Sequence, residues 1–176
     1  MPSHESIDLD GYIRDVPDFP RPGILFKDIT PMLADPRAFG AAIDRLAGHF
    51  EGRGVEAVAA AEARGFLFGA PLALRLGVGF IPIRKPGKLP YDKVGVEYAK
   101  EYGTDRLEVH RDALEPGRRV LLLDDVLATG GTMLACGELV RRAKAEVVAY
   151  AFVLELGFLG GRAKLGPAEV FSLLAY

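Results

Sequence analysis

The segment from Val120 to Thr132 restricts the possible folds of this chain more than any other. Its first residues, Val120–Leu123, are all aliphatic. An uninterrupted aliphatic run is typical of a strand that is buried on both faces, as in a parallel sheet. Two adjacent aspartates, Asp124 and Asp125, follow at the point where we expect this strand to end. Neighbouring carboxylates repel each other and need partners, so a pair at a strand end indicates a functional site.

The loop after the aspartates carries groups that bind an anion. It contains two glycines with accessible N–H groups and two threonine hydroxyls. We expect Thr132 to cap a helix that begins near Met133. This would place the loop at a helix N-terminus, where free N–H groups and the helix dipole favour phosphate. The two carboxylates can accept hydrogen bonds from sugar hydroxyls, and the loop beside them can bind a phosphate. Together they predict a ribose-5-phosphate site. The loop residues are Ala128, Thr129, Gly130, Gly131 and Thr132.

Alternative roles for this segment agree less well with its residues. A glycine pair between a strand and a helix also occurs as an ordinary connection in α/β proteins, but that connection does not require two aspartates. The chain contains no Gly-x-x-x-x-Gly-Lys-Ser/Thr sequence, and Gly77-Val78-Gly79 lacks the third glycine of a dinucleotide-binding loop. The phosphoribosyl interpretation is therefore preferred.

Length and composition indicate one globular domain. The chain has 176 residues, of which 49% are hydrophobic and 26% are charged, with a formal net charge of −2. This composition provides no basic surface for nucleic acid or for a membrane. The single cysteine, Cys136, excludes an internal disulfide and is typical of a reducing compartment. We find no signal peptide and no membrane-spanning segment in the sequence, and so expect a cytoplasmic location.

Predicted strands and helices alternate along the rest of the chain. Asp35 followed by Pro36 has the pattern of a helix start and Gly77 that of a helix end, although Pro71 suggests a kink or a late start in the second helix. The alternation predicts an α/β protein with a parallel sheet. We expect helices over 36–50 and 66–76, strands over 55–61, 78–83, 146–155 and 170–174, a short helical segment over 160–165, and a hairpin of 93–98 with 106–110.

Three loops with polar or charged residues follow predicted strands. They cover residues 62–65, 84–88 and 124–132. Ligands of open α/β sheets bind beyond the carboxyl ends of the strands. We therefore expect the three loops to meet at one edge of the sheet.

The segment with the aspartates resembles the phosphoribosyl-pyrophosphate (PRPP) motif of the type I phosphoribosyltransferases. Further segments, in the same order along the chain, resemble the adenine-specific members of this family. These are 17–20, 22–31, 63–69, 84–90, 101–104 and 171–174. The resemblance implies a single domain over 1–176 with a parallel-sheet α/β fold, a small N-terminal hood over 1–34 that binds the base, and a flexible, mobile lid hairpin over 88–110. It also implies transfer of the phosphoribosyl group of PRPP to adenine, giving AMP and pyrophosphate, with Mg²⁺ as cofactor and a homodimer as the assembly.

The resemblance implies roles for the charged residues of the three loops. Asp124 and Asp125 accept hydrogen bonds from the ribose hydroxyls, and Asp124 acts near Mg²⁺ directly or through a water molecule. The glycine-containing loop holds the 5′-phosphate. Arg64 acts in catalysis, and Arg64, Lys85 and Lys88 bind the departing pyrophosphate. Without the resemblance, the two lysines would be interpreted as part of a solvated basic loop.

By the same resemblance, the hood and the motif segment recognise adenine. Phe26 stacks on the adenine ring, the backbone of Leu25 and Lys27 contacts its edge, and Leu127 covers the opposite face. From the sequence alone, Leu25 and Phe26 could equally be core residues. The match around Phe26 argues against a 6-oxopurine or orotate as the base. A regulator that binds PRPP without catalysis would need a DNA-binding element, for which neither length nor charge leaves room.

Two residues near the tip of the predicted lid complete the implied site. Glu101 acts as a catalytic acid or base, or as a hydrogen-bond partner, at purine N7. Tyr102 belongs to the lid that excludes water. Because other charged residues surround Glu101, a simple surface charge would give the same pattern. The resemblance also implies a cis peptide at Glu62–Ala63.

Overall fold

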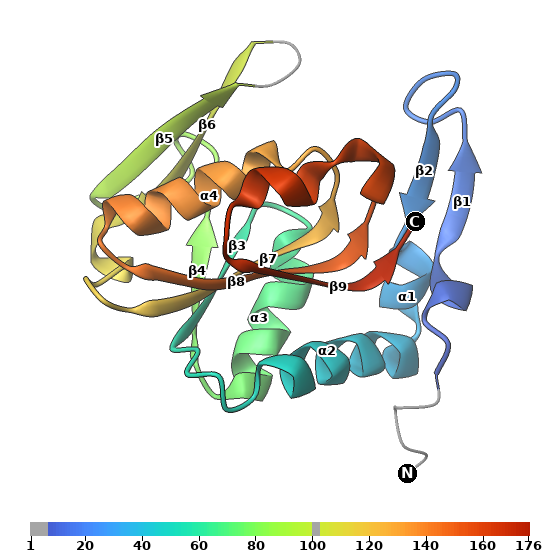
Figure 1. Ribbon diagram of the computed structural model, residues 1–176, viewed down its shortest axis with the longest axis horizontal. Coiled ribbons are helices and arrows are strands. Elements are labelled where there is room, and N and C mark those ends of the chain that lie inside the picture. The colour runs from blue at the N-terminus through green and yellow to red at the C-terminus, as the bar shows by residue number, and fades with distance from the viewer. Residues whose placement is uncertain (1–6, 100–102) are drawn as a thin grey trace.

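A parallel five-stranded sheet forms the centre of the computed structural model (Figure 1), which describes residues 7–99 and 103–176. The strands are β3 (Ala57–Ala61), β4 (Gly79–Ile83), β7 (Arg119–Leu127), β8 (Glu146–Glu155) and β9 (Glu169–Ala175). Their order across the sheet is β4-β3-β7-β8-β9, and all neighbours are parallel. This sheet confirms the α/β fold predicted from the alternation of elements.

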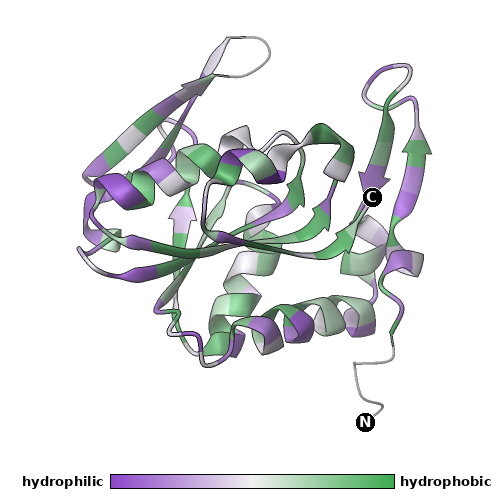
Figure 2. Cartoon of the chain, viewed as in Figure 1, coloured by the Kyte–Doolittle hydropathy of each residue, from purple (hydrophilic) through white to green (hydrophobic). Residues whose placement is uncertain are grey.

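Helices cover both faces of the sheet, and each face has its own hydrophobic core. The helices are α1 (Thr30–Ala34), α2 (Pro36–Phe50), α3 (Gly65–Leu76) and α4 (Gly131–Arg142), with 3₁₀ helices η2 (Asp10–Tyr12), η3 (Arg111–Ala113), η4 (Gly157–Leu159) and η5 (Gly161–Leu165). Side chains of β7 alternate between the cores. Val120 and Leu122 pack on the side of α4, and Leu121 and Leu123 on the side of α2 and α3. Figure 2 shows that the central strands are largely apolar, as this burial requires.

The ends of two helices agree with the signals in the sequence. Asp35 precedes α2, and its carboxylate accepts hydrogen bonds from the backbone N–H groups of Arg37 (2.8 Å) and Ala38 (3.3 Å). Helix α3 is followed by Gly77 in the left-handed conformation, with φ 70°. The expectation of a late start for α3 is wrong, because Pro71 lies inside the helix.

Small residues let α3 approach the sheet closely. A Cβ atom on Gly69 of α3 would lie 2.9 Å from the Cβ of Ala60 and 2.8 Å from the ring of Phe80, closer than real Cβ contacts. The same approach brings the start of α3 next to β7, since a Cβ on Gly65 would lie 3.1 Å from Oδ1 of Asp124. The first turn of α3 is therefore fixed beside the aspartates.

Two antiparallel hairpins stand at opposite ends of the edge that the carboxyl ends of the strands form (Figure 1). They are β1 (Arg14–Pro17) with β2 (Leu25–Asp28), and β5 (Lys93–Ala99) with β6 (Thr104–His110). The second hairpin confirms the predicted one and packs against α4. It is also joined to the end of β4, because the backbones of Arg84 and Glu108 exchange hydrogen bonds of 2.8 and 2.7 Å.

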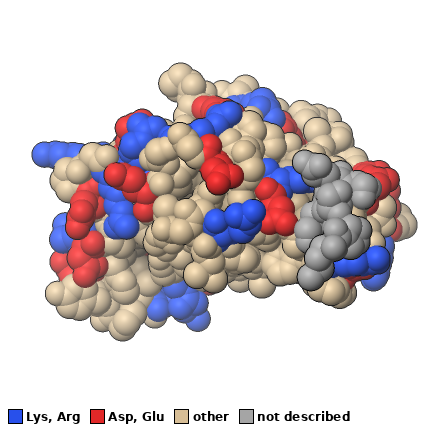
Figure 3. Space-filling model, turned by 90° about the horizontal axis from the view of Figure 1, so that it is seen from below, with Lys and Arg blue, Asp and Glu red and all other residues tan. Residues whose placement is uncertain are grey.

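The face opposite to the hairpin tips carries basic and acidic side chains in a mixed pattern (Figure 3). At the amino ends of β7 and β8, Nη1 of Arg119 lies 2.8 Å from Oε1 of Glu146. Among the described residues, no helix is both long enough and apolar enough to cross a membrane.

Candidate active site

The loops after β3, β4 and β7 come together at the carboxyl edge of the sheet, as predicted. Nε of Arg64, after β3, lies 2.7 Å from Oδ2 of Asp125 in β7. Oε2 of Glu62, in the same loop, accepts hydrogen bonds from Nε of Arg84 and from the backbone N–H of Lys85, both at 3.0 Å. The loop after β3 therefore contacts both of the others.

The predicted end of the strand at the aspartates is wrong, because β7 continues to Leu127 and includes them both. Successive residues of a strand point to opposite faces, so the carboxylates of Asp124 and Asp125 diverge. The carboxylate of Asp125 faces Arg64, and this residue is only 3% exposed. Oδ1 of Asp124 accepts a hydrogen bond of 2.9 Å from the N–H of Asp125.

The surroundings of Asp124 disfavour its negative charge in the free protein. Burial, and then the charge of Asp125, raises the pKa of Asp124 well above its ordinary value, while Arg64 acts in the opposite direction. Oδ2 of Asp125 is buried and accepts no hydrogen bond from the described residues, although it forms the ion pair with Nε of Arg64. Such an oxygen is available to a ligand hydroxyl or cation.

The donor atoms of this pair fit a magnesium ion. Mg²⁺ is commonly held by one or two carboxylates together with the phosphates of a substrate. Asp125 offers an oxygen without a hydrogen bond, and a nearby cation would favour the ionised form of Asp124. Within residues 7–99 and 103–176, no group of three or more potential ligands could hold a metal ion. The described part of the chain therefore provides no complete set of metal ligands by itself, and Mg²⁺ as cofactor stays a prediction.

The predicted cap of α4 is wrong, although the loop before it keeps the features of an anion site. The helix begins at Gly131, and Gly130 precedes it in the left-handed conformation, with φ 81° and without a side-chain cap. Thr132 lies in the first turn instead. No backbone hydrogen bond among the described residues uses the N–H groups of residues 131–133. Free donors at the positive end of a helix favour phosphate.

The start of η5 packs directly behind this loop. A Cβ atom on Gly130 would lie 2.7 Å from the carbonyl oxygen of Gly161. A Cβ on Gly161 would overlap the carbonyl oxygen of Ala128 and lie 3.0 Å from the nitrogen of Gly130. Only glycine fits at either position. Within the same loop, Thr129 is exposed. Gly161 is a site residue that was not predicted, because its only local signal in the sequence is the adjacent glycine before it.

The basic loop after β4 is held by Glu62. Burial acts to raise the pKa of Glu62, but hydrogen bonds from the N–H of Lys85 and from Arg84, with the charge of Lys88, outweigh it and lower the pKa. Arg84 is thus held in an ion pair, and the side chains of Lys85 and Lys88 are exposed. Their predicted contacts with pyrophosphate stay predictions.

The first hairpin brings Phe26 to the side chain of Arg64. The guanidinium carbon lies 5.8 Å from the centre of the Phe26 ring, within the range of a cation–π contact. Phe19 packs edge-on against the same ring, with 5.2 Å between centres. Phe26 is half-buried and Leu25 is 49% exposed. The alternative that the pair belongs to the core is therefore wrong.

Lys27 and Leu127, two further residues predicted to contact the base, have side chains that contact other parts of the protein. Nζ of Lys27 lies 2.6 Å from Oδ1 of Asp15 and 3.9 Å from the centre of the Tyr176 ring. The predicted contact of the Lys27 backbone with adenine stays a prediction. The side chain of Leu127 is 1% exposed and packs in the core on the side of α4, so its contact with adenine stays a prediction.

The predicted lid residues Glu101 and Tyr102 lie outside the described residues. The hairpin that leads to them stands next to the loop before α4, since a Cβ on Gly131 would lie 3.9 Å from the carbonyl oxygen of Ala99. The peptide between Glu62 and Ala63 is cis, as the resemblance implied.

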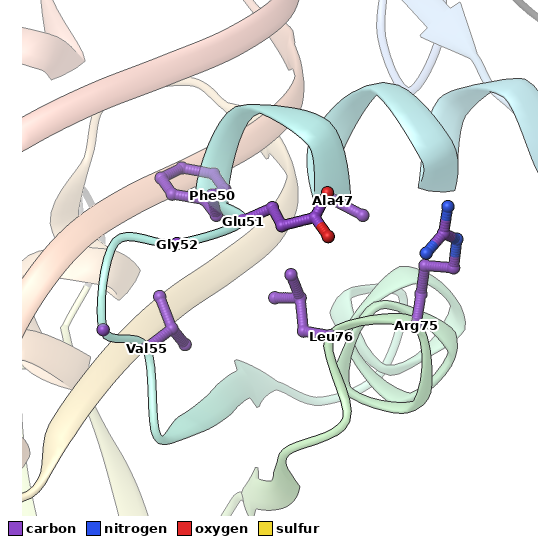
Figure 4. Close-up of a pocket in the computed structure, with 8 residues that line it drawn as sticks. Ala47, Phe50, Glu51, Gly52, Val55, Arg75 and Leu76 are labelled. Carbon is purple, nitrogen blue, oxygen red and sulfur yellow. The ribbon is translucent and has the colours of Figure 1, made fainter.

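A hollow of about 290 Å³ lies away from these loops (Figure 4). It is formed where α2 and α3 end, at the opposite end of the sheet. None of the residues that line it belongs to the three loops, so it is separate from the candidate site. Its lining residues are Ala47, Phe50, Glu51, Gly52, Gly54, Val55, Arg75 and Leu76.

Known proteins share both the sequence and the fold of this chain. Residues 31–165 match the model of the phosphoribosyl transferase domain family. The chain is 57% identical to the adenine phosphoribosyltransferase of Roseiflexus sp. (strain RS-1) over 164 residues, which cover 93% of this chain and 95% of that protein. The crystal structure of adenine phosphoribosyltransferase from Thermoanaerobacter pseudethanolicus ATCC 33223 is similar with a TM-score of 0.92 and 54% identity, covering 96% of this chain and 98% of that one.

A more distant relative was crystallised with ligands. It is the adenine phosphoribosyl transferase from Trypanosoma brucei in complex with AMP, pyrophosphate and ribose-5-phosphate. Its TM-score is 0.87 at 27% identity, covering 99% of this chain and 80% of that one. The family model matches most of the chain, and the bacterial relatives are similar over nearly their full length. The chain therefore belongs to the adenine phosphoribosyltransferase family.

Proposed function

We propose that the edge formed by the three loops converts adenine and PRPP into AMP and pyrophosphate, a reaction of purine salvage. The position of Arg64 carries this proposal. Its side chain contacts Asp125 at 2.7 Å and lies 5.8 Å from the ring of Phe26, so one residue connects the predicted ribose and base sites. The ligands of the trypanosomal relative support the same substrates for this chain.

Two anchors would fix the sugar of PRPP. The loop from Ala128 to Thr132 would hold the 5′-phosphate through its free N–H groups, and Asp124 and Asp125 would accept the ribose hydroxyls. Oδ2 of Asp125 accepts no hydrogen bond from the described residues, which supports this role. A sugar held at both ends presents C1′ to the base in one orientation, which is catalysis by positioning.

Cations would stabilise the leaving group. As the bond from C1′ to pyrophosphate breaks, negative charge grows on the pyrophosphate oxygens. Positive groups placed there stabilise the transition state more than the ground state. Arg64, Lys85 and Lys88 supply such groups, and Arg64 is oriented by its ion pair with Asp125. When bound near Asp124, Mg²⁺ would supply additional positive charge for the same oxygens.

The base would lie against the first hairpin. Phe26 would stack on adenine, the backbone of Leu25 and Lys27 would contact its edge, and Leu127 would close the opposite face after a shift of its side chain. Glu101 would share a proton with N7 as adenine N9 attacks C1′. Tyr102 would cover the site as part of the lid.

We extend the proposal to the organisation of the chain. Residues 1–34 would form the base-binding hood and 88–110 the lid of a single domain over 1–176. The position of the two hairpins at opposite ends of the candidate site supports this division. A homodimer in the cytoplasm is the expected state of the protein.

A panel of bases tests the function. Adenine, hypoxanthine, guanine and orotate are each supplied with PRPP and MgCl₂, and nucleotide formation is followed by chromatography. We expect AMP to form fastest, and a parallel reaction with EDTA to lose most of its rate. Faster reaction of any other base would overturn the substrate assignment. An undiminished rate with EDTA would exclude Mg²⁺ as a cofactor of the reaction.

A further inference from the structure

An ion pair between the buried carboxylate of Glu155 and the side chain of Arg162 lies at the end of β8, and none of the roles above uses it. Glu155 is 6% exposed, and Arg162 forms a bidentate contact with its carboxylate. Nε of Arg162 donates to Oε1 at 2.9 Å, and Nη2 donates to Oε2. Oγ of Ser172 donates to Oε2 at 2.8 Å, and Nη1 of Arg162 donates to the carbonyl of Val170 at 2.6 Å. These contacts join the end of β8 to β9 and to η5.

Helix η5 connects this ion pair to the loop before α4. Gly161 precedes Arg162 and packs on Ala128 and Gly130 so closely that no side chain fits between them. At the other end of η5, Leu165 is 1% exposed in the hydrophobic core. The short helix is therefore held at both ends, and its first residue, Gly161, packs against the backbone of the loop.

We propose that Glu155 and Arg162 are positioning residues for PRPP, which hold Gly161 against the loop and so keep the loop N–H groups in the arrangement that binds the 5′-phosphate. The inference rests on the proposed function, because it assumes that this loop holds a phosphate. A two-pronged contact between arginine and carboxylate fixes orientation as well as distance. The loop itself has no side-chain cap that could replace this support.

The variant Arg162→Lys tests the role, because lysine keeps the positive charge but cannot form the bidentate contact with the carboxylate. Arg119→Lys is the matched control. Arg119 pairs with Glu146 at 2.8 Å and donates to the carbonyls of Gly54 (2.9 Å) and Arg53 (3.2 Å), at the opposite end of the sheet. Both arginines join a carboxylate to backbone carbonyl groups, but only Arg162 lies beside the loop.

The measurements are the Kd of PRPP by calorimetry, the KM of PRPP, kcat and Tm. For Arg162→Lys we expect the Kd and KM of PRPP to rise on the order of tenfold. We expect kcat at saturating PRPP to stay within about twofold, because the lost binding is common to ground and transition states. Arg119→Lys should lower Tm and leave Kd and KM unchanged.

Unchanged affinity for PRPP in folded Arg162→Lys would overturn the proposal, as would an equal loss in both variants. If Arg162→Lys does not fold, Ser172→Ala decides, since it removes only one hydroxyl from Glu155. A higher KM for PRPP in Ser172→Ala supports the proposal and an unchanged KM overturns it. A wild-type chain that fails to bind PRPP would instead refute the proposed function, so the two failures are distinguishable.

Discussion

Gly161→Ala adds one methyl group and should impair the use of PRPP severely. The new Cβ would overlap the carbonyl oxygen of Ala128 and lie 3.0 Å from both the nitrogen of Gly130 and Cδ1 of Leu127. Backbone atoms cannot rotate away, so η5 and the loop must separate by about 1 Å to restore ordinary van der Waals contact. A misplacement of about 1 Å can reduce a rate by about 10²-fold. Overpacking of this kind also destabilises a fold by about 1–3 kcal/mol.

The assay is kcat/KM for PRPP at saturating adenine, with the free energy of unfolding measured in parallel. We expect kcat/KM to fall by about 10²-fold in Gly161→Ala. Gly48→Ala in α2 is the control, because no atom lies within 4 Å of its new Cβ. This control should keep wild-type kinetics and gain about 0.5–1 kcal/mol of helix stability. Wild-type kcat/KM in Gly161→Ala would refute the close support of the loop by η5.

Three further predictions concern carboxylates. Asp124→Asn should raise the free energy of unfolding at pH 7 and abolish turnover, because burial and the charge of Asp125 raise the pKa of Asp124 and so disfavour its charged form in the folded state. A variant that unfolds at a lower urea concentration than wild type would contradict this. Glu101→Gln should lower kcat by about 10²-fold or more with little change in substrate binding, and a wild-type rate in single-turnover kinetics would make Glu101 a surface charge. The hydrogen bond from Arg162 lowers the pKa of Glu155, so the ionised form contributes stability above its ordinary pKa and loses it as pH falls. The Tm advantage of wild type over Glu155→Gln should therefore shrink below about pH 4.5, and a constant advantage would exclude this linkage.

The sheet and its functional edge could be predicted because their signals are local. The aliphatic run of β7 and the alternation of strands and helices require only neighbouring residues to be interpreted. The rule that ligands bind beyond the carboxyl ends of strands then placed the three loops at one edge. The contact between Arg64 and Asp125 agrees with that placement.

Features that depend on contacts between distant segments could not be predicted. Gly130 precedes α4 in the left-handed conformation, and the carbonyl oxygen of Gly161 leaves no room for a side chain there. The helix therefore begins before Thr132, and the prediction of a threonine cap was misleading. The hairpin of β1 and β2 has no alternating apolar pattern, and its pairing appears only in three dimensions. Glu155 and Arg162 look like ordinary surface charges in the sequence, since the burial of Glu155 and its pairing with Arg162 come from the packing of η5 and β9.

The central claim is that the loop before α4 holds the 5′-phosphate of PRPP, and the Kd of PRPP for Gly131→Val tests it most directly. The Cβ that the substitution adds has room in the free protein, because the nearest atom to it is 3.9 Å away. It therefore acts mainly by crowding the bound phosphate. We predict that calorimetry with Mg²⁺ shows binding of PRPP to the wild type and an affinity on the order of tenfold or more lower for Gly131→Val. An unchanged Kd in Gly131→Val, with the fold intact, would contradict the claim.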